Sequence, residues 1–140
     1  MFLFRGGRVD LHSRARSWRE WLRGFFAEKD REARGLKLLR EWLSAEQLAQ
    51  FNVEGSFEVI GNHSEKRYRI LHGTSMNVHE IDAAGRPLLC WCFVPNGGYL
   101  VAGDVMLAQK IALETDELAA LAVANKFPPG NNQPHIPVRR

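Results

Sequence analysis

The period of the hydrophobic pattern changes twice along this chain, and these changes constrain the fold more than any single motif does. Up to residue 51, apolar residues recur every three or four positions, which predicts helices. From Ser56 they alternate, as in "SFEVIG" and "KRYRILHG", which predicts short strands. After Asp104, which we expect to cap the next helix, the helical period returns in "VMLAQKIALE". This order favours an α+β domain.

The predicted strands are joined by short links, which indicates an antiparallel meander of four to five strands. The sequences "AAGR" at 83–86 and "PNGG" at 95–98 are typical of tight turns. We expect helices within 17–51, a sheet within 56–102, and two C-terminal helices within 104–126 packed on one sheet face. The expected core residues are Phe57, Val59, Tyr68, Ile70, Val78, Trp91, Phe93, Leu107, Ile111 and Leu121.

Two serines mark predicted helix starts in the N-terminal part. Ser17 precedes Glu20 by three residues and Ser44 precedes Gln47 by three, and both pairs match the capping-box pattern. Lys29 and Glu32 interrupt the apolar face with charge. The segment before Ser44 is therefore either one long helix or two helices broken near 28–31.

The segment "SWREWLRGFF" at 17–26 is the most aromatic part of the chain. On a helix, with about 100° per residue, its apolar side chains fall within an arc of roughly 140°. They are Trp18, Trp21, Leu22, Phe25 and Phe26. Because large exposed apolar patches are rare, this surface must be covered by the chain's own sheet, by another protein surface or by a lipid interface. The sheet already has other helices to cover it, so we expect docking on a protein partner, most simply a second copy.

Positive charge is concentrated at the N-terminus. Residues 1–40 contain 11 Lys/Arg and 5 Asp/Glu, a net charge of +6, whereas residues 41–140 contain 8 and 11, a net charge of −3. We interpret residues 1–16 as a basic arm whose partner is anionic or is the acidic body of a neighbouring copy. An alternative function is therefore nucleic-acid or anionic-surface binding. Its candidate residues are Arg16, Arg19, Arg23, Lys66, Arg67 and Arg69.

The chain has two cysteines, Cys90 and Cys92, so no disulfide framework is expected and a cytoplasmic location fits best. Alternation along a strand places both thiols on the same face. Together with His72 and His79 they are weak candidates for a zinc site. Because no second cysteine pair and no typical histidine spacing is present, we favour two buried core thiols and expect no metal and no cofactor.

No catalytic signature is present: the chain has neither a phosphate-binding GxxxxGK[ST] nor a nucleophile GxSxG. This favours a non-enzymatic protein, with a small enzyme or zinc protein using the cysteine and histidine region as a further alternative. No apolar run is long enough for a transmembrane segment. The tail, residues 128–140, contains four prolines and no periodicity, and we expect it to be disordered.

The middle and C-terminal segments also occur in a familiar order. "FEVIG", "KRYRI", "NVHEID", "CFVP" and "GDVMLAQKIALE" follow one another with a spacing that resembles a pattern in small bacterial and phage-borne proteins of unassigned function. The resemblance covers about the last two thirds of the chain without the tail. It implies no activity and no site residues, and the aromatic N-terminal helix lies outside it.

Overall fold

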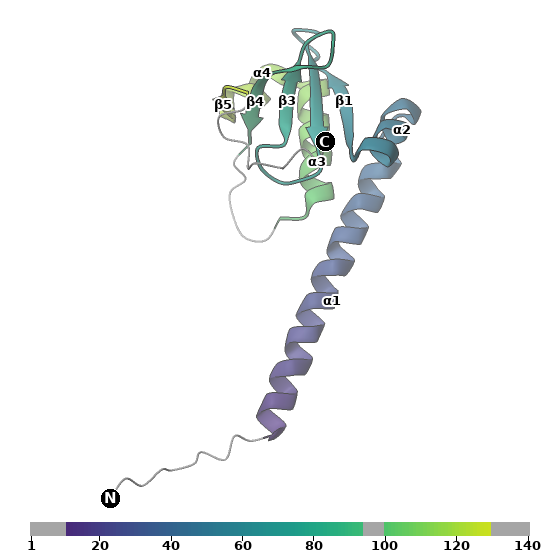
Figure 1. Cartoon of the computed structure of the whole chain (residues 1–140), viewed down its shortest axis with the longest axis vertical. Coiled ribbons are helices and arrows are strands. Elements are labelled where there is room, and N and C mark those ends of the chain that lie inside the picture. The colour runs from purple at the N-terminus through teal and green to yellow at the C-terminus, as the bar shows by residue number, and fades with distance from the viewer. Residues whose placement is uncertain (1–10, 94–99, 130–140) are drawn as a thin grey trace, which may run out of the picture.

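The computed structural model describes residues 11–93 and 100–129, with the side chains of 11–15 left out. Within these ranges the fold is α+β, as predicted: four helices and a five-stranded antiparallel sheet. The first helix extends far beyond the body that the sheet and the other helices form (Figure 1). The elements in chain order are α1 (Leu11–Trp42), α2 (Ala45–Glu54), β1 (Ser56–Ile60), β2 (Arg67–Leu71), β3 (Val78–Ile81), β4 (Pro87–Cys92), α3 (Ala102–Thr115), α4 (Glu117–Val123) and β5 (Asn125–Phe127).

The sheet follows the chain order β1-β2-β3-β4-β5, so each strand pairs with its neighbour in sequence. Phe57 pairs with Ile70 and Val59 with Tyr68, which places these four side chains on one face. That face meets α3, and α3 in turn contacts both α1 and α4. The core cluster consists of Leu39, Leu43, Phe51, Phe57, Val59, Tyr68, Ile70, Val78, Met106, Leu107, Leu113 and Ala120.

The second helix begins where the sequence predicted. The hydroxyl of Ser44 accepts a hydrogen bond from the Gln47 N–H, and the Gln47 side chain accepts one from the Ser44 N–H, which completes the capping box. The helix continues to Glu54, three residues past the expected end. It stops at Gly55, whose φ of 69° suits a residue without a Cβ.

The first helix is continuous, which settles the alternative left open by the charged residues at 28–31. It also begins earlier than predicted, at Leu11. Ser17 and Glu20 therefore lie inside the helix and form no capping box, and part of the segment interpreted as an arm is helical. A serine inside a helix costs only a few tenths of a kcal/mol relative to the better helix formers, so the local capping pattern did not determine the start.

The C-terminal half differs from the prediction at three places: the end of the sheet, expected at residue 102, the cap expected at Asp104, and the end of the last helix, expected near residue 126. Leu100 and Val101 lie outside any strand, and the fifth strand is instead β5, which pairs with β4. Asp104 does not cap α3, because this helix already begins at Ala102 and has no side-chain cap. The last helix ends at Val123, and its start is capped by Asp116, which accepts from the Ala119 N–H.

The predicted core is largely confirmed, with one clear error. Ile111 is 41% exposed, because the buried face of α3 instead carries Met106, Leu107, Gln109, Lys110 and Leu113. Trp91, Phe93 and Leu121 are partly buried against the core, and the other six expected residues are buried. The predicted turn at 83–86 joins β3 to β4. The turn at 95–98 and the tail from residue 130 lie outside the described residues.

Candidate functional site on the first helix

Five apolar side chains on α1 form a surface that we call the aromatic stripe: Trp18, Trp21, Leu22, Phe25 and Phe26. The Trp18 and Trp21 rings stack with their centroids 5.3 Å apart, and Trp21 stacks on Phe25 at 5.7 Å. Phe26 meets Phe25 edge to face at 5.8 Å. The structure thus brings together the residues that the sequence singled out, as one connected apolar surface.

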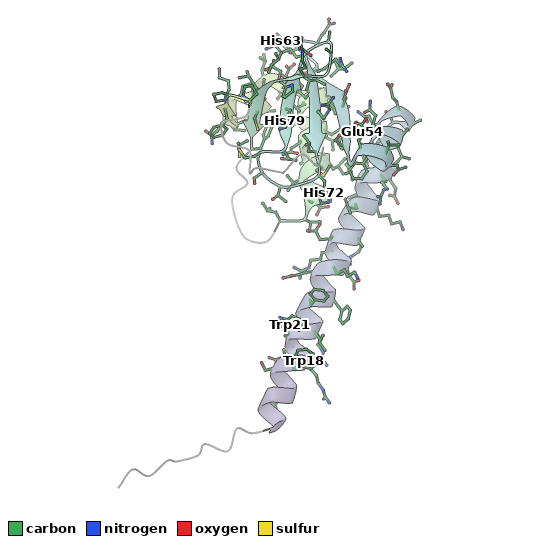
Figure 2. All side chains as sticks on the ribbon, viewed as in Figure 1. Trp18, Trp21, Glu54, His63, His72 and His79 are labelled. Carbon is green, nitrogen blue, oxygen red and sulfur yellow. The ribbon has the colours of Figure 1, made fainter. Side chains whose placement is uncertain are left out.

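The aromatic stripe is not covered by the body. Trp18, Trp21, Phe25 and Phe26 are 61%, 58%, 49% and 56% exposed. Every described side chain from Arg16 to Arg31 is exposed, apart from the half-buried Leu22. Trp18 and Trp21 lie on the part of α1 that extends beyond the body (Figure 2).

The stripe is in line with the face that α1 buries against the body. Trp18, Trp21 and Phe25 each precede a leucine of that face by eighteen residues, which is about five helical turns. These leucines are Leu36, which is partly buried, Leu39, which is fully buried, and Leu43, which directly follows the end of α1 and is also buried. The same side of one helix is therefore covered at its C-terminal end and bare at its N-terminal end.

Two glycines hold α1 against α3. A Cβ placed on Gly103 would overlap the backbone of Gly35, and a Cβ on Gly35 would overlap the side chain of Val101. The two helices can pack this closely only because both positions lack a side chain. This crossing and the burial of Leu39 fix the direction of α1, so the aromatic stripe is presented at a defined place relative to the body.

The candidate anion-binding residues fall into two separate groups. Arg16, Arg19 and Arg23 are exposed on the free part of α1, to one side of the stripe. Lys66, Arg67 and Arg69 lie in or beside β2 and are engaged by carboxylates. The Lys66 ammonium lies 2.8 Å from Glu80, and its hydrogen bond to Glu80 raises the pKa of Lys66.

Glu58 forms ion pairs with both arginines of β2. Its carboxylate oxygens lie 2.7 Å from the Arg67 guanidinium and 3.4 Å from that of Arg69. Glu58 and Arg69 are cross-strand partners, a position at which opposite charges stabilise a sheet. These contacts leave less free positive charge on the sheet for an anionic partner than the sequence alone indicates.

The cysteines lie on one face of β4, with Cys90 directly opposite His79 of β3. Both thiols are free and buried, and the Cys90 thiol donates to the Met76 carbonyl oxygen at 3.5 Å. Burial, and secondarily Cys92, raises the pKa of Cys90, whereas burial and Arg69 lower the pKa of His79. A raised thiol pKa disfavours the thiolate that would bind a metal.

The histidines are spread over the body: His63, His72 and His79 lie at well-separated places (Figure 2). Within the described ranges, no three His, Cys, Asp or Glu side chains form a group that could hold a metal ion. His72 is exposed just after β2, so the structure does not bring it to the cysteine pair as a further ligand.

A buried carboxylate, Glu117, is the most connected polar group that sequence analysis missed. It accepts hydrogen bonds from the backbone N–H groups of His63 and Ser64 at 3.0 and 2.9 Å, from the Ser64 hydroxyl, and from the Tyr68 hydroxyl at 2.6 Å. Burial opposes ionisation of Glu117, but the hydrogen bonds outweigh it and lower its pKa to about 2.

The pKa of Tyr68 is raised, first by burial and then by Glu117. Neither group therefore exchanges protons near neutral pH, as a general acid or base would have to do. We interpret the cluster as a tie between α4 and the loop that joins β1 to β2. Sequence patterns do not indicate this cluster, because Glu117 resembles any acidic residue in the first turn of a helix.

A polar pocket of about 620 Å³ lies between α2, β1 and α3. Both described cations that line it are paired: Lys110 lies 2.5 Å from Glu114, and Arg67 lies 2.7 Å from Glu58. Gln47 donates to Glu114 at 3.0 Å and also to the Glu58 carbonyl oxygen. These polar side chains of the pocket are thus paired with one another, and their contacts indicate no ligand.

Comparisons with protein-family models, with curated proteins and with solved structures found no match. The resemblance noted in the sequence therefore adds nothing to the function. In the described ranges, no helix combines the length and the apolar character that crossing a bilayer requires.

Proposed function

We propose that this protein is a non-enzymatic binding module that docks on a protein surface, that of a partner or of a second copy, through the aromatic stripe. One observation carries this proposal: three large aromatic rings stack in the open on a helix whose direction the body fixes. Stacked tryptophan and phenylalanine side chains lose little conformational entropy on binding, and tryptophan is enriched among residues that dominate interface energetics.

A lipid surface fits the same stripe less well. Trp21 and Phe25 are in line with Leu39 and Leu43, so the body lies on the stripe's side of the helix, where a flat bilayer would have to be. Glu20 is exposed on the same segment and dilutes its positive charge. These points support a protein surface as the binding partner.

Nucleic-acid binding remains the alternative that the exposed arginines of α1 favour. Apolar docking and phosphate binding respond differently to salt, because phosphate contacts release condensed counterions and weaken steeply as salt rises. If association through α1 falls by orders of magnitude between low and moderate salt, and if a nucleic acid competes for it, the proposal of apolar docking is wrong.

The test compares two double substitutions on the same helix. Trp21→Ala with Phe25→Ala removes two of the five side chains of the aromatic stripe. Leu38→Ala with Trp42→Ala removes matched apolar surface, 41% and 59% exposed, from elsewhere on α1. We expect the first variant to weaken association at least about 100-fold, as the loss of two hot-spot residues does, and the second to leave it nearly unchanged.

Association is measured by sedimentation velocity and by stoichiometric co-purification, and folding of the body by thermal melting. An equal loss of association in both variants would mean that the aromatic stripe is not the specific docking surface. Cooperative unfolding of the Trp21→Ala, Phe25→Ala variant would place the stripe in the core. Binding of the wild type to vesicles of anionic and neutral lipid, lost in the same variant, would replace the protein surface with a membrane.

A further inference from the structure

We infer that the surface covering the aromatic stripe is the same stripe of a second copy, paired antiparallel with a two-fold axis near Trp21. This inference rests on the proposed function and names its partner. Three features of the structure point to it: the side of α1 on which the body lies, the length of α1 left bare, and the distribution of charge.

The position of the body disfavours a parallel pair. A partner helix that covers Trp21 and Phe25 lies on the side of α1 that, five turns further on, carries Leu39 and Leu43. Those leucines are buried against the body. A parallel partner continuing along α1 would run into α3 at Gly103, whereas an antiparallel partner runs away from it.

The bare length of α1 suits an antiparallel copy of itself. The helix begins at Leu11, and among its described side chains, which start at Arg16, the first buried residue is Gly35. The segment from Leu11 to Arg31 spans 21 residues, or about 32 Å at 1.5 Å per residue. With the two-fold axis at Trp21, Leu11 of one copy lies beside Arg31 of the other. Each helix then ends just before the other body begins, and neither has to bend.

Charge favours the same arrangement. The chain up to Arg16 carries four arginines and one aspartate, and residues 41–140 carry a net charge of −3. Antiparallel pairing brings the N-terminal end of each helix, which carries Arg14 and Arg16, towards the acidic body of the other copy. It also brings that end towards the exposed Glu28 and Asp30 of the partner helix. A parallel pair would instead place the two basic starts side by side, which like charges oppose.

In this register the two stripes overlap over most of their length. Trp18 of one copy then lies beside Gly24 and Phe25 of the other, and the two Trp21 rings meet at the axis. The contact is isologous, so it closes at two copies and does not continue into a filament. We therefore expect a dimer whose two bodies lie at opposite ends of a short antiparallel helix pair.

The test measures distances between spin labels on the paired chains, at sites outside the aromatic stripe. The full-length variants are Arg23→Cys and Lys37→Cys, both at exposed positions of α1. In the antiparallel dimer, two labels at 23 are offset along the axis by about 6 Å, and two labels at 37 by about 48 Å, at 1.5 Å per residue. The unsubstituted chain, whose thiols are buried, is the labelling control.

Short distances at both sites would show a parallel pair and overturn the inference, while leaving the proposed function intact. A wild type that sediments as a monomer at every concentration tested would also overturn it, and the stripe would then bind another protein. A long distance at 37 that persists in the Trp21→Ala, Phe25→Ala background would show pairing that does not use the stripe, which would contradict the proposed function itself.

Discussion

The two halves of α1 carry apolar side chains in the same line, but only the C-terminal half buries them. Leu39 and Leu43 lie within the core cluster, whereas Trp21 and Phe25, five turns earlier, are about half exposed. The residue types differ in the same direction: aliphatic where the chain supplies its own partner, aromatic where it does not. Aromatic side chains are typical of surfaces that exchange water for another protein.

The two regions also differ in how polar groups hold them. In the body, Asn77 and Gln109 exchange two amide hydrogen bonds of 2.8 and 2.9 Å, and Glu117 ties α4 to the β1–β2 loop. In the free half of α1, by contrast, aromatic rings contact one another. Changes in the body should therefore alter stability, and changes in the free half should alter association.

The largest effect is expected from acid, through Glu117. Its pKa is lowered from 4.5 to about 2 on folding. The stabilisation is thus fully present above pH 4.5 and is lost as the pH falls towards 2. A difference of this size corresponds to roughly 3 kcal/mol of unfolding free energy.

Urea unfolding between pH 6 and pH 2.5 measures this loss. Glu117→Gln should be less stable at pH 6 and should lack that part of the pH dependence. Glu20→Gln on the free half of α1 is the matched control and should behave like the wild type. An unchanged pH dependence in the Glu117→Gln variant would show that the carboxylate does not hold the loop.

A smaller effect, of opposite sign in the two regions, is expected from glycine. Gly103→Ala forces a Cβ against the backbone of Gly35 and should destabilise the body by about 2 kcal/mol. Gly24→Ala meets nothing within 4 Å and should stabilise the free half by up to about 1 kcal/mol through helix propensity. Thermal melts and helical circular dichroism distinguish these outcomes, and equal effects at both sites would contradict a tight crossing at Gly103.

The smallest effect is expected from removing metal ions. If Cys90 and Cys92 act only as buried side chains, the protein should purify without zinc and keep its melting temperature in excess chelator. Metal analysis and a melt with and without chelator measure this. Stoichiometric zinc, or a lowered melting temperature in chelator, would return the cysteine and histidine region to consideration as a site.

Sequence predicted the parts of this fold that local patterns determine. Alternation located four strands, and the Ser44–Gln47 pair located α2, because strand faces and caps depend on residues within a few positions of each other. The aromatic stripe was predicted for the same reason, since its five residues lie within nine positions of one helix.

What sequence could not predict depends on contacts between distant segments. β5 has only three residues, too few to show alternation, and it exists because β4 offers an edge to pair with. Gln109 and Lys110 can be buried because Asn77 hydrogen-bonds Gln109 and Glu114 pairs with Lys110. Hydrophobicity alone therefore predicted the burial of Ile111, which lies on the exposed side of α3. Periodicity likewise predicted an apolar surface that another surface must bury, but it did not identify that second surface.

The unbroken course of α1 has a mechanical consequence. Its hydrogen-bonded backbone continues from the stripe to the crossing at Gly35, and Trp21 lies about 21 Å before that glycine at 1.5 Å per residue. A continuous helix of this length is stiff, and its close contact with the rest of the protein is at Gly35 and Gly103. A force that acts on the aromatic stripe is therefore transmitted through α1 to α3, the helix that packs against the sheet. Binding at the stripe is in this way mechanically connected to the core.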